Sequence, residues 1–152
     1  MINNIEEVLI NVFYDDGSLR DIFIKETNLS DWNILMNFFK SLPNLTLSFD
    51  GEKTNQIPTS ISELFMLKNE KAVLLSINYK SIIINCHFCC EDEIELDVSP
   101  REITTIKEVN AVLEFMDKLA RLLNKDVSIS IENDSECPLI TIRSDGEYIK
   151  NY

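Results

Sequence analysis

The one cluster of residue types that could form a zinc knuckle or a redox dithiol is Cys86-His87-Phe88-Cys89-Cys90. Cys86 and Cys89 have the CxxC spacing of zinc knuckles and of redox dithiols. The cluster continues the strand-like segment 82–85, and residues three apart on a strand point to opposite faces. Only Cys137 remains for a second ligand pair, and no helix follows that would stabilise a thiolate. We therefore expect buried core cysteines, no metal site and no redox site.

Catalysis by a histidine could use only His87, the single histidine of the chain. A Ser-His-Asp or Cys-His arrangement would need it beside a nucleophile. No serine stands in a GxSxG motif, however, and the adjacent Cys86 faces the other side of the expected strand. Gly17, Gly51 and Gly146 each follow an aspartate and fit turns, so the chain has neither a phosphate-binding loop nor a dinucleotide fingerprint. We expect no catalytic residue, no cofactor and a protein that is not an enzyme.

Acidic residues form the pattern with the clearest functional meaning. Ile94, Leu96 and Val98 alternate with acids, so if these apolar residues face the core, the acids between them project from the opposite face. Alternate strand residues lie roughly 6.6 Å apart, and like charges at that spacing repel unless a cation or a basic partner neutralises them. The members of this first acidic set are Glu91, Asp92, Glu93, Glu95 and Asp97.

A second acidic set follows a later strand, with no Lys or Arg between its members: Glu132, Asp134 and Glu136. We interpret the two sets as a docking surface for a basic protein. Two alternatives stay open. The acids can form a solvated sheet edge, where charge prevents strand pairing. They can also take part in metal-assisted carboxylate catalysis, which draws its ligands from several elements.

The overall charge favours the same kind of partner. The 152 residues have a formal net charge of −12, which repels nucleic-acid phosphates and an anionic membrane surface. A basic protein is attracted instead, especially at low salt, although the acidity can also serve solubility alone. No apolar run approaches the roughly 20 residues of a membrane span, and residues 1–7 lack the basic and apolar regions of a signal peptide. We expect a cytoplasmic protein.

Hydrophobic periodicity predicts the elements that would position the acids. A helix over residues 105–123 has apolar residues at three- and four-residue spacing, with Thr105 and Glu108 as its capping box. Strands at 93–98 and 126–131 flank this helix in sequence. Their alternating apolar residues indicate that the helix packs on a sheet.

Earlier in the chain, residues 8–14 and 19–24 predict a hairpin with a turn at 15–18. A helix that begins at Ser30, its N-cap, and ends before Pro43 follows. The other expected elements are a strand at 45–49, a mobile loop at 52–59, a short helix at 60–67 and strands at 72–79, 81–90 and 139–143.

The two halves of the chain share an order of elements. Residues 8–51 and 81–133 each read strand, strand, helix, strand, and both final strands alternate apolar residues with small hydroxyls. A duplicated β-β-α-β unit within a single domain of residues 1–152 would explain this, and chance alternation is the alternative. The predicted fold class is α+β, a mostly antiparallel sheet with the two main helices packed on one face.

In size, acidity and α+β architecture, the chain resembles the bacterial immunity proteins of polymorphic and contact-dependent toxin systems. The resemblance implies stoichiometric inhibition, in which carboxylates occupy the basic cleft of a toxin, often a nuclease. It rests on whole-chain properties, so no residue role is taken from the family. Carboxylates can mimic phosphates and steer association. The hypothesis is a protein that binds a basic toxin or enzyme through the two acidic sets. A carboxylate- or metal-dependent hydrolase and a homodimeric structural module are the alternatives.

Overall fold

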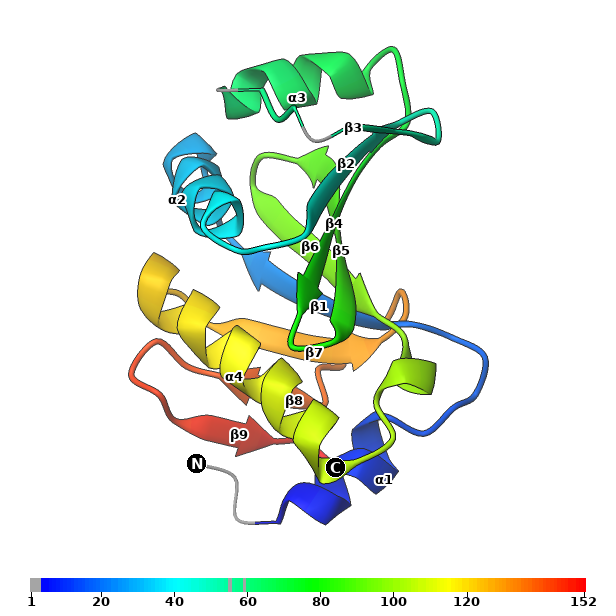
Figure 1. Ribbon diagram of the computed structural model, residues 1–152. Helices are drawn as coiled ribbons and strands as arrows, with labels where there is room; N and C mark the ends of the chain where they lie inside the picture. Colours follow the sequence, from blue (N-terminus) through cyan, green and yellow to red (C-terminus); the bar gives the residue numbers. More distant parts are fainter. Residues whose placement is uncertain (1–3, 55, 59) are drawn as a thin grey trace.

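The structure is a computed structural model that describes residues 4–54, 56–58 and 60–152. Within these residues, one nine-stranded sheet runs through the molecule in the order β3-β2-β4-β5-β6-β1-β7-β8-β9, and each neighbouring pair is antiparallel. Four α helices lie against one face of the sheet (Figure 1). The predicted α+β class, with a mostly antiparallel sheet and the main helices on one face, is confirmed.

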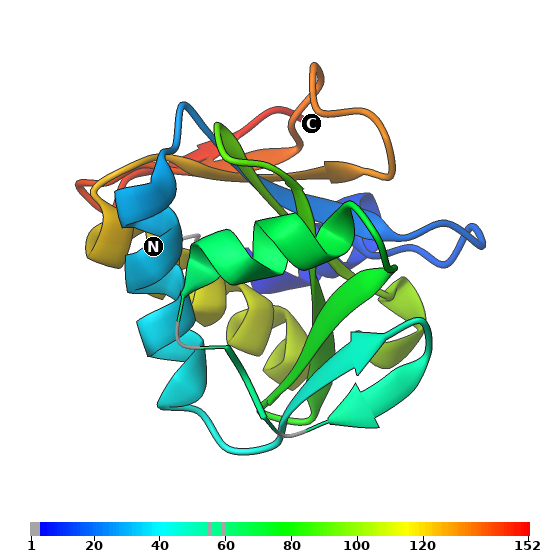
Figure 2. The ribbon, with the colours of Figure 1, turned by 90° about the horizontal axis from the view of Figure 1, so that it is seen from above.

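The helices are α1 (Ile5–Val12), α2 (Leu29–Lys40), α3 (Ile61–Lys68) and α4 (Ile106–Leu123), and a 3-10 turn occupies Pro100–Glu102. The strands are β1 (Arg20–Lys25), β2 (Leu45–Phe49), β3 (Glu52–Thr54), β4 (Val73–Tyr79), β5 (Ile82–Cys90), β6 (Glu93–Val98), β7 (Val127–Ile131), β8 (Ile140–Ile142) and β9 (Tyr148–Lys150). Seen from above, α2 and α4 lie on one side of the sheet, and the β7–β8 connection projects away from them (Figure 2).

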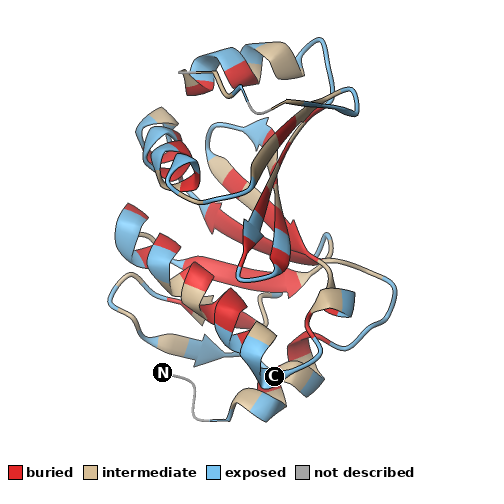
Figure 3. Ribbon diagram, in the orientation of Figure 1, coloured by how far each residue is buried: buried red, intermediate tan, exposed pale blue. Residues whose placement is uncertain are grey.

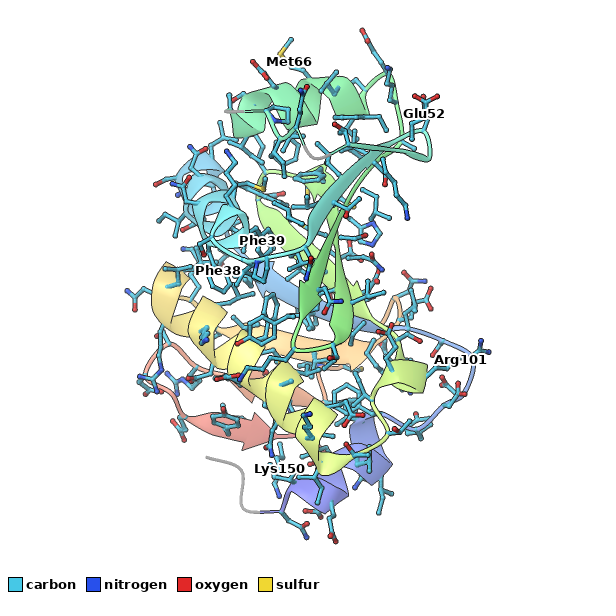
Figure 4. The ribbon with its side chains drawn as sticks, in the orientation of Figure 1. Phe38, Phe39, Glu52, Met66, Arg101 and Lys150 are labelled. Carbon is cyan, nitrogen blue, oxygen red and sulfur yellow. The ribbon has the colours of Figure 1, made fainter. Side chains whose placement is uncertain are left out.

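The helices and the inward side chains of the sheet share one hydrophobic core (Figure 3). The predicted apolar stripe of α4 is buried from Val109 to Leu123. Phe115 of α4 stacks on Phe39 of α2, with ring centroids 6.4 Å apart and an interplanar angle of 9°. Phe38 lies beside them, 6.3 Å from Phe115 (Figure 4). This aromatic contact joins the two main helices above the sheet.

The caps of these two helices differ from those predicted. Thr105 is the N-cap of α4 but makes no side-chain hydrogen bond, so the predicted capping box there is wrong. Asn28, rather than Ser30, caps α2. The Asn28 side chain accepts a hydrogen bond from the Asp31 backbone N–H at 3.0 Å, and the Asp31 carboxylate accepts one from Asn28 N–H at 3.1 Å. α2 therefore has the reciprocal box that α4 lacks.

The strand predicted at residues 8–14 is wrong, because this segment lies mostly in α1. Asn4 caps the helix by accepting a hydrogen bond from Glu7 N–H at 3.3 Å. Val8 and Val12 lie one turn apart and are both fully buried. The apolar run thus follows a helical period that begins before it, at Ile5.

Without that strand, β1 has no hairpin partner before it and pairs instead with β6 and β7. Residues 8–51 contain helix, strand, helix and strand, so they do not form the predicted β-β-α-β unit. Residues 81–133 do contain two strands, a helix and a strand. The first segment therefore lacks the first strand of the predicted repeat.

The loop predicted at 52–59 contains β3, which pairs with β2. Asn55 and Thr59 of that loop lie outside the described residues, as do residues 1–3 of the N-terminal segment. None of the helices in the described part of the chain is both long and apolar enough to cross a lipid bilayer.

Candidate functional site

The acids of β6 project from the sheet face opposite the helices, which we call the polar face. Ile94, Leu96 and Val98 are fully buried in the core, as the alternation predicted. The neighbouring strands add side chains in register with the acids. On the three central strands, the polar face includes Asp21, Phe23 and Lys25 of β1, Ile83, Asn85, His87 and Cys89 of β5, and Glu93, Glu95 and Asp97 of β6.

Asp97 is the most firmly held acid of the polar face. Its Oδ1 accepts a hydrogen bond from Asn85 Nδ2 at 3.1 Å, and its Oδ2 lies 2.5 Å from His87 Nε2. Ser76 Oγ of β4 donates to Asn85 Oδ1 at 2.8 Å and so fixes the orientation of the amide. Asp97 is only 6% exposed. With both of its carboxylate oxygens engaged, Asp97 supports the polar face from within.

The same bond sets the charge of the imidazole. The hydrogen bond that His87 Nε2 donates to the Asp97 carboxylate raises the pKa of His87 above its ordinary value, burial lowers this pKa, and the nearby Glu95 and Asp21 raise it further. Hydrogen bonding to the charged form favours that form. His87 thus contributes positive charge to an otherwise acidic face over a wider pH range than a free histidine would.

Asp21 lies directly opposite Asp97 on the adjacent strand. It is 7% exposed, and its Oδ2 accepts a hydrogen bond from the Asn133 backbone N–H at 2.8 Å. Burial raises the pKa of Asp21, the Asn133 bond lowers it, and Glu95, Asp97 and Glu132 raise it again. Like charges directly opposite each other on neighbouring strands are destabilising. The surroundings of Asp21 therefore disfavour the charged form of its carboxyl group.

The second acidic set reaches the polar face through the loop after β7. Glu132 N–H donates to Leu19 O at 3.1 Å, and Leu19 N–H donates to Glu132 Oε1 at 2.8 Å. Further along this loop, Glu136 forms an ion pair of 3.8 Å with Lys25 of β1. The loop thus lies beside β1, and the two acidic sets adjoin across that strand.

The β5–β6 turn presents the remaining acids of the first set. Glu91 and Asp92 are exposed. The Glu91 carbonyl accepts hydrogen bonds from Thr27 Oγ1 at 2.7 Å and from Trp32 Nε1 at 3.1 Å. Trp32 is fully buried, so it fixes the turn from below and is not an interface residue.

The eight predicted site residues therefore divide into two groups. The side chains of Asp97 and Glu132 hold the framework together through hydrogen bonds. The other six keep partial or full exposure: Glu91, Asp92, Glu93, Glu95, Asp134 and Glu136. Asp21 and Asn85 were missed. Asn85 stands between the buried Ile84 and Cys86, which is the signal that identified the acids of β6, whereas Asp21 stands between the buried Arg20 and Ile22 and lacks that signal.

A small recess opens between β1, β6 and the loop after β7. Its volume is about 240 Å³, and it is lined by Asp21, Phe23, Glu93, Glu95, Asn133 and Ser135. A larger cavity of about 760 Å³ lies on the helical side, where Lys80, Lys107, Asp117 and Tyr148 are among its lining residues. Its charges are mixed in sign. A third cavity, of about 600 Å³, adjoins the loop after β7 and is also mixed in charge, with Lys25, Lys125 and Glu136 in its lining. The charged residues that line the small recess are all acids.

The cysteines do not assemble into a site. Cys86 is fully buried as expected, but Cys89, Cys90 and Cys137 are exposed. The register between β5 and β6 shifts between His87 and Cys90, which takes the end of β5 out of the core. Burial raises the pKa of Cys89, and a hydrogen bond with Asp92 raises that of Cys90 to about 11. Protonated thiols are weak nucleophiles and weak metal ligands.

Metal-binding geometry is equally missing from the described part of the chain, where no three His, Cys, Asp or Glu side chains are placed to hold an ion. A scan against protein-family models, a search of curated proteins and a search of solved structures found no match to this chain. The polar face carries carboxylates from β1, β6 and the loop after β7, together with one imidazole and a small recess. Such a surface is suited to binding cationic groups.

Proposed function

We propose that this chain is a cytoplasmic immunity-type protein that neutralises a basic toxin or enzyme by stoichiometric binding. One observation supports the proposal above all others. Carboxylates from three separate segments, namely β1, β6 with the turn before it, and the loop after β7, converge on the face of the sheet that the helices do not cover. A one-sided charge distribution of this kind steers an oppositely charged protein into one orientation.

The exposed acids are the proposed contact residues, and we call them the acidic patch. They are Glu91, Asp92, Glu93, Glu95, Asp134 and Glu136. Asp97 and Glu132 position the patch from below, through His87 and Leu19. Each is held by hydrogen bonds to neighbouring elements. The patch is therefore presented on a rigid base, which reduces the entropy lost on binding.

Two other functions have weaker support. A carboxylate- or metal-dependent hydrolase would need an ion site or a nucleophile beside the His87–Asp97 pair, and the thiol of Cys89 on that face has a raised pKa. A homodimer formed by strand pairing would need a long apolar edge. The sheet edges in the described residues are β3 and β9, each three residues long, with Glu52, Lys53 and Lys150 among them. Short charged edges oppose such pairing.

The proposal is tested with two variants of equal charge change. The first replaces Glu91, Glu93 and Glu95 of the acidic patch by Gln. The matched control replaces Glu52, Glu63 and Glu70 by Gln, which are exposed acids of β3, α3 and the turn after α3 and lie outside both acidic sets. Wild type and both variants are immobilised, the partner is captured from lysate of the producing cell at low salt, and its association rate is measured with the purified proteins.

We expect the patch variant to associate about tenfold more slowly and with a flatter salt dependence, because charged residues at an interface act mainly on the on-rate. The control should behave as wild type. The captured protein should be basic, and its activity should fall to zero at a one-to-one ratio. Equal association by all three proteins, or a captured partner that keeps full activity when saturated, would refute the proposal.

A further inference from the structure

The recess between β1, β6 and the loop after β7 contains a buried acid with an unused acceptor. Asp21 is more than nine-tenths buried, and its Oδ2 is bonded to Asn133 N–H. Within the described residues, its Oδ1 accepts no hydrogen bond, although Asp21 lines the recess. Among the described residues, buried side-chain oxygens without a partner occur at Glu108 and Asp117 and not at Asp21, so Asp21 Oδ1 is accessible from the recess. The recess therefore holds an acceptor that is still available to a ligand.

The cations already on the polar face are engaged elsewhere. His87 is bonded to Asp97, and Lys25 pairs with Glu136. Asp21 and Glu95 occupy diagonal positions on adjacent strands, because Asp21 faces Asp97 and Phe23 faces Glu95. Diagonal neighbours of this kind have Cα atoms about 7 Å apart, within the span of one bridging group. The recess thus brings two carboxylates within reach of one cationic group, and the only donor to the Glu95 carboxylate in the described residues is the Cys89 thiol at 3.6 Å.

The shape of the recess favours a planar cation. The Phe23 ring forms part of its wall, and Lys25 Nζ lies 5.5 Å from the centroid of that ring, so the ring already borders one cation. A guanidinium donates five hydrogen bonds in one plane and stacks on aromatic rings, whereas an ammonium is a compact, strongly hydrated point charge. A guanidinium can donate to Asp21 and Glu95 from one plane while it lies against the exposed edge of Phe23, which is 5% exposed, whereas an ammonium has no such planar fork.

Resting on the function proposed above, we propose that this recess is the socket for one arginine side chain of the basic partner. The guanidinium donates to Asp21 Oδ1 and to the Glu95 carboxylate and packs on Phe23. The acidic patch then supplies orientation and rate, and the socket supplies a desolvated anchor of the kind that dominates affinity at protein interfaces.

The test uses two small probes, N-acetylarginine methylamide and N-acetyllysine methylamide, titrated into the whole protein. Amide chemical shifts are followed by NMR, with Asn133 and Ser135 as reporters of the recess. We expect saturable shifts at both reporters with a millimolar Kd for the arginine probe. We also expect binding at least about threefold weaker for the lysine probe, because an ammonium lacks the planar fork.

Three variants make the assignment specific. Asp21→Asn and Glu95→Gln should each weaken the arginine probe at least about fivefold, because charge-assisted hydrogen bonds are lost. Glu70→Gln, at an exposed acid outside both the recess and the acidic patch, should leave the Kd unchanged. Far-UV circular dichroism identifies any variant that is unfolded, and Glu95→Gln, on a partly exposed side chain, keeps the test valid if Asp21→Asn does not fold.

The outcomes separate the socket from the function on which it rests. If no saturable shift occurs at Asn133 and Ser135, or if all three variants alter the Kd equally, the socket is refuted even where the acidic patch still captures its partner. If the arginine probe binds as expected but no basic partner is inhibited, the socket stands and the immunity-type function is refuted.

Discussion

Arg20 and Asp21 are neighbours on β1 that are both buried, yet they lie on opposite faces of the sheet and are treated differently. Arg20 is fully buried on the helical side. Its Nε donates to Val12 O at 2.5 Å, its Nη2 to Tyr14 O at 2.7 Å and its Nη1 to Asp16 Oδ1 at 3.2 Å. It therefore supplies positive charge at the carboxyl end of α1, whose last turn has no basic residue.

Asp21 receives one backbone hydrogen bond and lies among Glu95, Asp97 and Glu132. The buried charge on the helical side is thus matched by acceptors and closes a helix. The buried charge on the polar face is left among charges of its own sign. Natural proteins depart from local consistency mainly at functional sites. We infer that the helical face was shaped for stability and the polar face for binding.

The largest effect is expected on the helical side, from Arg20→Met. The change keeps an unbranched apolar stem but leaves the carbonyls of Val12 and Tyr14 without their donor. Removing one partner of a buried charged network costs about 3 kcal/mol of unfolding free energy, measured as a lower midpoint of urea denaturation. Arg101→Met is the control, since Arg101 is exposed and only pairs at 3.6 Å with Asp15 (Figure 4). It should change stability by less than about 0.5 kcal/mol.

If Arg20→Met lowers the unfolding free energy by no more than Arg101→Met does, the two faces of β1 do not differ in the way described.

Asp97→Asn should lower the pKa of His87 towards its ordinary value, because the imidazolium loses its carboxylate acceptor. His87 has a raised pKa in the folded state, so its contribution to stability is fully present below the unfolded value of 6.5 and is lost as the pH rises through the folded value. The stability deficit of Asp97→Asn should be about 1.5 kcal/mol at pH 5.5, reduced by solvent screening of the half-exposed imidazole, and smaller at pH 9.

The proton signals of the single histidine report its pKa by NMR without ambiguity. A His87 pKa that is unchanged in Asp97→Asn would mean that Glu95 and Asp21, and not the hydrogen bond, control the imidazole.

The local patterns of the chain predicted much of this framework. The stripe of α4 and the alternation of β6 each depend on residues a few positions apart, and both were correct. The same reasoning failed at residues 8–14. This apolar run has high strand propensity, and the prediction overlooked both the N-cap at Asn4 and the helical spacing of the apolar residues that follow it. A short apolar segment does not by itself distinguish a strand from a buried helix.

The composition of the polar face was harder to predict, because it depends on pairing between distant segments. The bond between Asn133 and Asp21 joins residues 112 positions apart, and that between Leu19 and Glu132 joins residues 113 apart. Nothing near Asp21 in sequence shows that it will face Asp97. Whether an acid becomes a support, like Glu132, or a contact, like Asp134, is likewise decided by tertiary register.

The smallest effect is expected at Asp21 itself, and its sign is opposite to that of the other two. Asp21→Asn keeps an oxygen that can accept the Asn133 N–H but removes a desolvated charge from a cluster of acids. The pKa of Asp21 is raised above 3.8 in the folded state. Its ionisation therefore opposes folding at every pH above this folded-state pKa. The variant should be more stable than wild type by about 1 kcal/mol at pH 7. This advantage should shrink as the pH falls through the folded pKa of Asp21 towards 3.8, where wild type is also neutral. Urea denaturation at pH 7 and pH 4 measures both values.

If Asp21→Asn is less stable than wild type at pH 7, the acid is a structural group like Arg20, and the contrast between the two faces of β1 disappears. A variant that gains stability while it loses the arginine probe would show that the polar face sacrifices folding free energy to hold a binding site open.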